Sequence, residues 1–262
     1  MTPEVRTACG HWGWDEHRHF GHAVFGELAA HENLTGLLAL SILGRRLSAT
    51  DCAVLDLTAA CVTLADARIW PLKMTRLVAA YGHSVAATAA GLLIEEEARI
   101  GPWTTLKSGQ ILTHFRASLG AEPTPERLRK EVDAYLAEHR FIWGFGTPFR
   151  EHDERLVAYR RCLEPLGALD RPYFRLASAL AEVVQTVCGK PMNMGMAIAA
   201  VLLDLGLELH QVGPMTTALM QHMFFAHAVE AARETPSLAR LLPQEFVAYT
   251  GPEPRSSPRA SR

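Results

Sequence analysis

Apolar side chains recur along most of the chain at the three- to four-residue spacing of α-helices, whereas the alternation typical of strands is almost absent. Asn33 stands where a helix cap is needed, and Thr124 followed by Pro125 is typical of a helix start. The pattern predicts an all-α protein. Helices are expected over 34–43, from Ser48 or Thr50 to Ala65, after Pro71 to Ala80, and over 84–94, 105–119, 125–139, 153–163, 171–187, 194–209 and 216–233.

Four segments need a separate interpretation. Residues 10–22, rich in Trp, His and Gly, are expected to form a hairpin or an irregular arm. Gly101-Pro102 is expected to interrupt the chain before the helix at 105. The run of three acids at 95–97 is typical of a solvated helix face. Residues 194–209 are apolar but too short to span a bilayer comfortably, so the sequence predicts a buried helix there.

Composition narrows the class of protein. The 262 residues carry a formal net charge of −2, and 48% of them are hydrophobic and 21% charged. Such a chain can bury a core, and its near-neutral balance argues against a nucleic-acid partner. The five cysteines are scattered without a CxxC motif, which favours the reducing cytoplasm. No apolar run follows the N-terminus, so neither a signal peptide nor a membrane partner is expected, and the Pro-, Ser- and Arg-rich residues 253–262 are expected to be flexible.

Histidines give the first candidate for a chemical site. If residues 17–22 form a strand, His17 and His19 share one face, as two zinc ligands do, and His22 follows closely. Spacing fixes no third ligand, so a solvated hairpin is the preferred interpretation and no metal site is predicted. His222 and His227 lie five residues apart on one helix and are interpreted as core or interface residues with satisfied hydrogen bonds.

A glycine-containing loop at 144–147 gives the second candidate. Glycine allows backbone N–H groups to approach a ligand closely, and a polar cluster containing His152 and Arg155 follows. This arrangement can bind an anion, or it can be a plain turn before the charged first turn of a helix. Met192, Met194 and Met196, at every second position, indicate an adaptable core rather than a cofactor site.

Several short motifs follow one another along the chain. They are Leu92-Leu93 through Gly101, Gly144-Phe145-Gly146, Arg155, Pro191-Met192-Asn193, Ala226-His227 and Tyr249-Thr250-Gly251-Pro252. Their order and spacing resemble the citrate synthase superfamily, most closely its short members, citryl-CoA lyase and the C-terminal module of ATP-citrate lyase. The resemblance covers nearly the whole chain, from Asn33 to Pro252.

The resemblance implies an all-α fold in which a large domain (1–105 and 208–262) and a small domain (106–207) enclose a cleft. It also implies a homodimer that acts on a small-molecule substrate, with a coenzyme A thioester as the possible substrate and no tightly bound cofactor. Members of the family join or split a carbon–carbon bond next to a thioester carbonyl. A carboxylate moves the α proton, histidines polarise the two carbonyls, and arginines hold the substrate carboxylates.

Most of these functional positions are altered here. Thr104 stands at or near the place of one family histidine, and Thr147 replaces the other. The family's Asn-Val-Asp, which carries the base, ends in Gly195, and a substrate-binding arginine has become Met220. Threonine cannot polarise a carbonyl as an imidazolium does, and glycine cannot take a proton. We therefore expect no citrate synthesis by the family's usual mechanism, and turnover of acetyl-CoA with oxaloacetate above about 1 s⁻¹ would contradict this.

Two classes of function remain open. The first is a repurposed enzyme of specialised metabolism that acts on a less acidic acyl substrate by condensation, cleavage or cyclisation. The second is a non-catalytic member of the family that serves as a binding or scaffold subunit. For the enzyme, the candidate polar groups are Thr104, Thr147 and His152 for catalysis and Arg155 and Asn193 for substrate binding. The resemblance implies contacts to coenzyme A from Gly144, Phe145 and Gly146.

Overall fold

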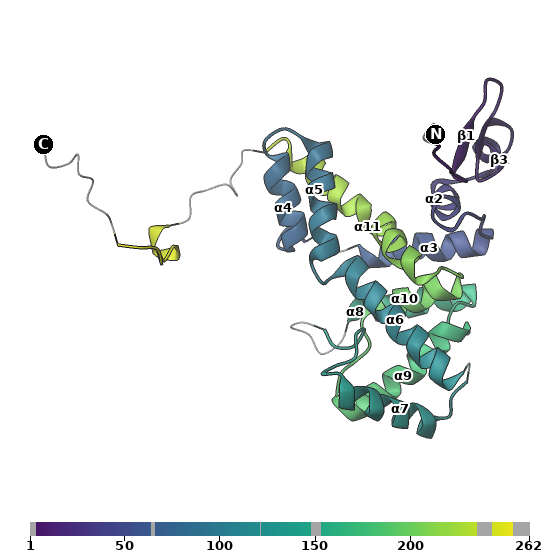
Figure 1. Ribbon diagram of the computed structural model, residues 1–262, viewed down its shortest axis with the longest axis vertical. Coiled ribbons are helices and arrows are strands. Elements are labelled where there is room, and N and C mark those ends of the chain that lie inside the picture. Colours follow the sequence, from purple (N-terminus) through teal and green to yellow (C-terminus); the bar gives the residue numbers. More distant parts are fainter. Residues whose placement is uncertain (1–3, 64–65, 121, 148–152, 235–242, 254–262) are drawn as a thin grey trace, which may run out of the picture.

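The computed structural model describes residues 4–63, 66–120, 122–147, 153–234 and 243–253. The prediction of an all-α protein is confirmed: helices dominate the described chain, and strands are confined to a small N-terminal sheet (Figure 1). The α-helices are α1 (Ala29–His31), α2 (Leu34–Leu43), α3 (Ala49–Val62), α4 (Trp70–Ala79), α5 (Ser84–Glu97), α6 (Gly101–Leu119), α7 (Pro125–Glu138), α8 (Glu154–Leu163), α9 (Pro172–Cys188), α10 (Met194–Asp204) and α11 (Leu209–Ala231).

Helix starts follow the capping chemistry of the sequence. The side chain of Asn33 accepts a hydrogen bond from the Gly36 amide at 2.8 Å and begins α2. Ser48, rather than Thr50, caps α3, and Thr124 caps α7. Each cap satisfies an amide that would otherwise lack an intrahelical partner, which contributes about 1 kcal/mol. Ala65, the predicted end of the second helix, lies outside the described residues; α3 ends at Val62.

The predicted buried helix over 194–209 is wrong in its length. Helix α10 ends at Asp204, and α11 begins at Leu209 after a bend of 117°. Gly206 adopts a left-handed φ of 80°, and Glu208 forms a capping box with Gln211. This local chemistry ends one helix and starts the next, although the apolar pattern continues across the break. The later helix also begins earlier than 216, because it runs through Pro214.

The predicted interruption at Gly101-Pro102 is also wrong. Both residues belong to the first turn of α6, where the missing N–H of a proline has no intrahelical partner to lose. Helix α6 therefore runs unbroken from Gly101 to Leu119. It packs against both α10 and α11, which places its first turns close to the start of α10.

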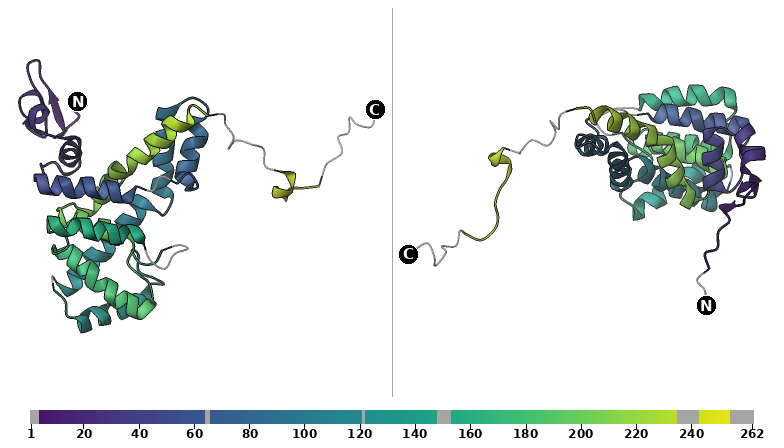
Figure 2. Two further views of the ribbon diagram at one scale, coloured as in Figure 1. Left: turned by 180° about the vertical axis from the view of Figure 1, so that it is seen from behind. Right: turned by 90° about the horizontal axis from the view of Figure 1, so that it is seen from above.

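Two packing regions differ in the size of their side chains. The main core joins α2, α3, α6 to α10 and the first part of α11 around large residues such as Phe115, Tyr159 and Phe174. At one end of the molecule, α4 and α5 lie side by side with the C-terminal part of α11 (Figures 1 and 2). Small side chains make this second packing close, and the buried alanines there are Ala79, Ala87, Ala228 and Ala231.

The predicted division into domains stays a prediction. Helix α6 passes through residue 105, where the boundary was expected, without a break. The main core also combines Val54 and Leu55 from the expected large domain with Leu112 and Leu180 from the expected small one. The expected flexible tail lies almost wholly outside the described residues, of which only Glu253 belongs to it.

The N-terminal segment forms three short antiparallel strands in the order β1 (Gly10–Trp12), β2 (His17–His19) and β3 (His22–Ala23), which confirms the expected hairpin. A π-helical turn, η1 (Val24–Leu28), leads from them into α1. Two further short helices are η2 (Glu164–Leu166) and η4 (Gln244–Phe246). No single helix in the described chain has the length and apolar character needed to cross a membrane. Helices α10 and α11 have that length and apolar character only when they are taken together, and the pair is bent.

Candidate functional site

The loop at 144–147 lies against the segment that leads into α10. Phe145 and Met192 form an isolated antiparallel bridge. The Gly146 amide donates to the Pro191 carbonyl at 2.7 Å, and the Asn193 amide donates to the Gly144 carbonyl at 3.0 Å. Two motifs that are nearly fifty residues apart in the sequence are therefore joined by backbone hydrogen bonds.

Gly144 requires the absence of a side chain. Its φ of 93° is strained for any other residue, and a Cβ there would lie 2.5 Å from the Met196 Cε and 2.9 Å from the Ser108 Oγ. Met196 belongs to α10 and Ser108 to α6. The loop is thus pressed into the angle between these two helices.

Thr104 and Gly195 meet at the same place. A Cβ on Gly195 would lie 3.1 Å from the Thr104 Cγ2, so these residues are in contact across the α6–α10 packing. The Thr104 hydroxyl donates to the Arg99 carbonyl at 3.0 Å. The position expected to hold a histidine and the position expected to hold a catalytic carboxylate are therefore neighbours, and neither carries a group that transfers protons near neutral pH.

Asn193 has a structural role in this arrangement. Its side-chain oxygen accepts from the Met196 amide at 3.3 Å and caps α10, while its side-chain NH₂ group donates to the Gly146 carbonyl at 3.1 Å. The side chain therefore fixes the loop to the helix start. One further N–H of the amide group remains to contact a ligand.

Arg155 is held by Asp153. The guanidinium donates to both carboxylate oxygens of Asp153, at 2.8 and 2.7 Å. Asp153 is 6% exposed, caps α8 and also accepts from the Met194 amide at 3.4 Å. Burial alone would raise the pKa of Asp153, but the hydrogen bonds and charge of Arg155 outweigh it, so the pKa is lowered.

The structure thus brings together most of the predicted site. Thr104, Gly144, Phe145, Gly146 and Asn193 surround the start of α10, and Arg155 joins them through Asp153. Thr147 follows Gly146 directly and is half-buried. His152, the third predicted catalytic residue, lies outside the described residues.

Comparison with known proteins identifies the fold. No sequence model of a known family matches the chain, and no curated protein does so either. Solved structures do match. Citryl-CoA lyase from Hydrogenobacter thermophilus superposes with a TM-score of 0.84 at 20% identity, covering 98% of this chain and 98% of that one. The protein has the citrate synthase fold.

Two larger proteins share this fold. A mutant ATP citrate lyase from Methanosaeta concilii, solved in complex with (3S)-citryl-CoA, matches with a TM-score of 0.74 at 14% identity, over 100% of this chain and 43% of that one. Citrate synthase from Thermoplasma acidophilum matches with a TM-score of 0.64 at 17% identity, over 88% of this chain and 61% of that one. The expected resemblance to the citrate synthase superfamily is confirmed at the level of the fold.

Within the citrate-synthase-like fold, His19 and His22 make ordinary protein contacts, whereas the buried Nδ1 atom of His17 has no hydrogen-bond partner among the described residues. His19 bonds to the Cys9 carbonyl at 2.7 Å and to the Ser41 hydroxyl at 3.0 Å, and His22 pairs with Glu27 at 2.8 Å. In the part of the chain that the structure describes, no group of three or more His, Cys, Asp or Glu residues is arranged to hold a metal ion. The hydrogen bonds support the interpretation of His19 and His22 as part of a hairpin.

The other histidines and the methionines agree with their structural interpretation. His222 bonds to the Thr63 hydroxyl at 2.8 Å, and the buried His227 lies 3.3 Å from the guanidinium of Arg76. The methionines of the 192–196 segment are all buried in the main core, at 4%, 3% and 0% exposure for Met192, Met194 and Met196.

The prediction of a solvated face at 95–97 is wrong for Glu95. Glu96 and Glu97 are exposed, but Glu95 is only 2% exposed, and its Oε2 atom has no hydrogen-bond partner. Burial raises the pKa of Glu95 to about 7. The helical spacing contains the missed signal, because Glu95 lies four residues after Gly91 and eight after Ala87, both on the buried face of α5.

Glu95 lies next to the first turn of α6. A Cβ on Gly101 would lie 2.8 Å from the Glu95 Oε1 and 3.3 Å from the Met220 Cε, so both side chains approach the same glycine. Met220 is the residue at the position of the expected arginine. Sequence reasoning found Met220 and Thr104 but missed the carboxylate packed beside them.

An aromatic group borders the glycine loop and was also missed. Trp103 and Trp143 pack edge to face at 4.6 Å, and Trp143 and Phe141 repeat this geometry at 4.6 Å. The ammonium of Lys107 lies 5.6 Å from the centre of the Trp103 ring. Phe141 remains 49% exposed. A partly exposed aromatic surface beside a cation suits a planar ligand that carries negative charge.

Proposed function

We propose that this protein forms, cleaves or cyclises a carbon–carbon bond next to the thioester carbonyl of an acyl-CoA substrate. The observation that carries the proposal is the convergence of Thr104, residues 144–146 and residues 193–195 at the start of α10. Three separate motifs of the citrate synthase superfamily meet there. Because Gly195 and Met220 replace charged groups, the substrate is less acidic and more apolar than citryl-CoA, as expected of specialised metabolism.

Each predicted residue has a role in this proposal. Gly144, Phe145 and Gly146 shape the surface for the coenzyme A end, and the aromatic group around Trp103 receives its planar base. Asn193 donates to the acyl part, and Arg155, oriented by Asp153, provides its charge at the edge. Thr147 and His152 supply hydrogen bonds to the reacting carbonyls, and the Thr104 hydroxyl does so when it exchanges the Arg99 carbonyl for the substrate. The small molecules required are the acyl-CoA and, in the direction of condensation, the carbonyl compound that it joins, and no tightly bound cofactor takes part.

The test is the binding of coenzyme A thioesters. Thermal unfolding is followed while the protein is titrated with acetyl-CoA, butyryl-CoA, benzoyl-CoA or citryl-CoA. The matched control is an N-acetylcysteamine thioester, which lacks the nucleotide. A ligand at about a hundred times its Kd stabilises the folded state by about 2.7 kcal/mol, which is a clear rise in Tm. We expect the largest rise with an apolar acyl-CoA and none with the truncated thioester. No rise with any thioester at saturation would overturn the proposal.

A second candidate rests on a specific observation. Gly195 stands where the family base is expected, so the protein can instead serve as a binding or scaffold subunit. In that case acyl-CoA thioesters stabilise the protein but are not converted. Incubating the best ligand with the protein and following products by mass spectrometry separates the two functions.

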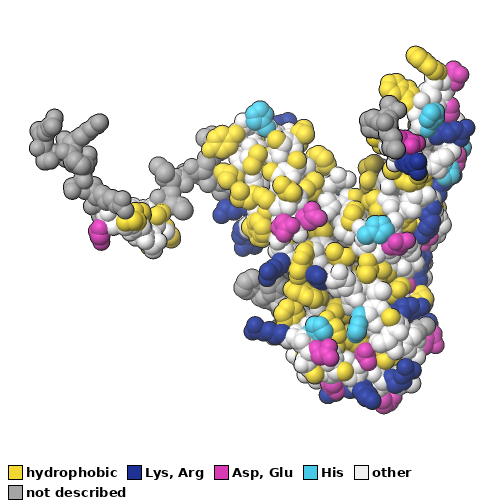
Figure 3. Space-filling view, in the orientation of Figure 1, with side chains coloured by type: hydrophobic (Ala, Val, Ile, Leu, Met, Phe, Trp, Pro, Cys, Tyr) yellow, Lys and Arg dark blue, Asp and Glu magenta, His cyan; other side chains and the backbone are white. Residues whose placement is uncertain are grey.

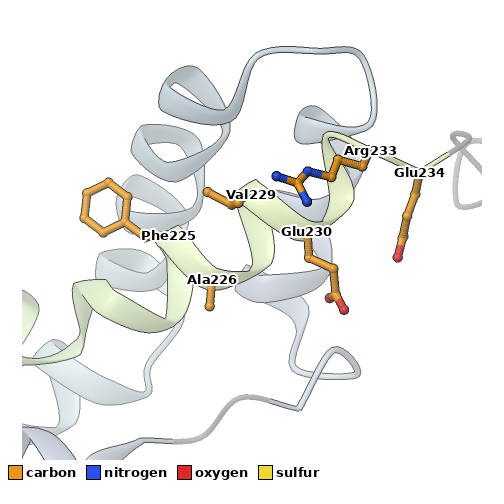
Figure 4. A pocket seen from close by; sticks show the side chains of 6 residues that line it. All are labelled: Phe225, Ala226, Val229, Glu230, Arg233 and Glu234. Carbon is orange, nitrogen blue, oxygen red and sulfur yellow. The ribbon is translucent and has the colours of Figure 1, made fainter.

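We further propose that the functional unit is a homodimer. Hydrophobic side chains gather over α4, α5 and the C-terminal part of α11 (Figure 3). Val85 and Leu93 on α5 are 82% and 69% exposed, and Phe225 and Val229 on α11 are 49% and 53% exposed. Arg233 adjoins this surface (Figure 4). In a dimer with a twofold axis, this face of one subunit packs against the same face of the other, and the apolar side chains of both copies are buried.

Light scattering tests the dimer. Val229→Glu places a charge in the proposed interface and is expected to give a monomer, because an unpaired charge cannot be buried there without a large cost. Val157→Glu is the matched control, since Val157 is 66% exposed on α8 and lies outside this face. An unchanged dimer in Val229→Glu, or a monomeric parent protein, would contradict the proposal. The reducing cytoplasm stays a prediction from the cysteine pattern.

A further inference from the structure

We propose that Glu95 is the group that moves the proton in this reaction, in place of the carboxylate that Gly195 does not provide. The inference rests on the proposed function, because it assigns a residue to the same site. It concerns a carboxylate on α5, a helix that none of the predicted site residues belongs to.

The first argument is the isolation of this carboxylate. Glu95 is 2% exposed and its Oε2 atom has no hydrogen-bond partner. No ion pair with Glu95 is found among the described residues, and burial is the cause of its raised pKa. A buried carboxyl without partners lowers the stability of a fold, and such groups are concentrated at functional sites.

The second argument is position. Glu95 Oε1 lies against Gly101, which has no side chain to separate it from the surface. Thr104 is one helical turn further along α6 and contacts Gly195. Glu95 therefore lies within one turn of the place where the family's reacting groups are expected, and its carboxylate packs against that turn.

The third argument is access. Met220 covers Gly101 from α11, and both residues are half-buried. A methionine side chain has three rotatable bonds and moves easily. Rotation of the thioether away from Gly101 opens a path from the half-exposed surface to the Glu95 carboxylate, whereas the arginine expected at this position would pair with that carboxylate and neutralise it.

The proton balance is simple. In cleavage of a β-hydroxyacyl thioester, the Glu95 carboxylate takes the hydroxyl proton as the bond between the α and β carbons breaks. The bonding electrons pass into the thioester, which gives an enolate and a free carbonyl compound. Protonated Glu95 then returns its proton to the α carbon. Condensation follows the same steps in reverse. A pKa near 7 suits both directions, because the carboxyl accepts and donates near neutral pH.

Hydrogen exchange tests this step without the second substrate. Acetyl-CoA and butyryl-CoA are incubated with the protein in D₂O, and deuterium entering the α carbon is followed by NMR. Glu95→Gln keeps the shape of the side chain but cannot take a proton, so we expect exchange to fall at least 100-fold. Glu96→Gln is the matched control, because Glu96 is the exposed neighbour on the same helix, and its exchange rate is expected to be unchanged.

A second variant tests the role of the cover. Met220→Arg places a cation beside Glu95 and is expected to shift the pH midpoint of exchange to lower pH and to slow exchange at pH 7. Thermal stabilisation by the same thioesters is measured for every variant. Two results would overturn the role of Glu95 but leave the proposed function standing. In the first, thioesters stabilise the parent protein but it catalyses no exchange. In the second, thioesters stabilise both proteins and Glu95→Gln exchanges as fast as the parent protein. The absence of stabilisation in the parent protein overturns the proposed function.

Discussion

Asp153 and Glu95 are two buried carboxylates with different surroundings. Asp153 has a structural role, whereas Glu95 is the residue proposed to act in the reaction. Asp153 accepts hydrogen bonds from Arg155 and from the Met194 amide, and it joins α8 to α10. Glu95 is as deeply buried on α5, but its Oε2 atom has no partner. The first carboxylate stabilises the site. The second destabilises the fold, which is the pattern of a group retained for a reaction.

The two groups also have opposite pH dependences. The pKa of Asp153 is lowered, so its contribution to stability is present above the pKa of an unfolded aspartate and is lost as pH falls through the folded value. The pKa of Glu95 is raised from 4.5 to about 7, so the folded state binds the extra proton and loses stability as pH rises between these values. Stability curves therefore distinguish them.

Replacement of Asp153 is expected to have the largest effect. Asp153→Ala removes the cap of α8 and leaves Arg155 without its partner, so the free energy of unfolding at pH 7 is expected to fall by about 4 kcal/mol. Urea denaturation measures it. Asp153→Asn is the matched variant that keeps the cap and loses the charge, and it is expected to lose less. A loss below about 0.5 kcal/mol in Asp153→Ala would mean that this carboxylate does not hold α8 to α10.

Glu95→Gln is expected to act in the opposite direction. At pH 8 the parent protein buries a charge that the variant does not, so the variant is expected to be more stable by roughly 3 kcal/mol, from 1.36 kcal/mol per unit of pKa. The difference is expected to vanish as pH falls toward 4.5, where the carboxyl is protonated. Urea titrations at both pH values measure it. An equal difference at the two pH values would show that the change is steric rather than electrostatic.

Gly101→Ala tests the space between Glu95 and Met220. The added Cβ meets the Glu95 Oε1 at 2.8 Å, at a φ of 49°. Gly189→Ala is the matched control, because φ is 63° there and no atom lies within 4 Å of the added Cβ. The control is expected to cost about 1 kcal/mol by strain, and Gly101→Ala about 2 kcal/mol by strain and crowding. Equal losses in calorimetry would show that the site at Gly101 is open.

Glu96→Gln is expected to have the smallest effect. Glu96 is exposed on the same helix as Glu95, and surface substitutions of this kind usually change stability by no more than about 0.5 kcal/mol. The stability of this variant is expected to follow that of the parent protein from pH 5 to pH 8. A pH-dependent difference would mean that the effect of Glu95→Gln belongs to the acidic run as a whole.

Local chemistry explains what the sequence predicts well. Caps such as Asn33 and Thr124 act within one helical turn, so their effect is visible in a short window of residues. The break between α10 and α11 was missed because the apolar spacing continues through it. The capping box at Glu208 determines where α11 begins. In the same way Pro102 was taken as an interruption although it stands in the first turn of α6.

The candidate site was predicted in part. Family motifs named Thr104, Gly144 and Asn193, and the structure brings them together. Two features of the site could not be predicted: the ion pair between Arg155 and Asp153, and the burial of Glu95. Both depend on packing between helices that are far apart in the sequence. A run of three acids looks solvated, and only its position relative to Gly91 on the helix shows that one of the three turns inward.

Helix α11 connects features that have so far been treated one by one. It carries Met220 beside Glu95, and five and nine residues later it carries Phe225 and Val229 in the proposed interface. At 1.5 Å per residue these positions lie about 8 and 14 Å apart along one rigid axis. In the proposed homodimer, the residues at the subunit interface and the residue that covers Glu95 belong to the same helix, so a shift of α11 on subunit association would also move Met220.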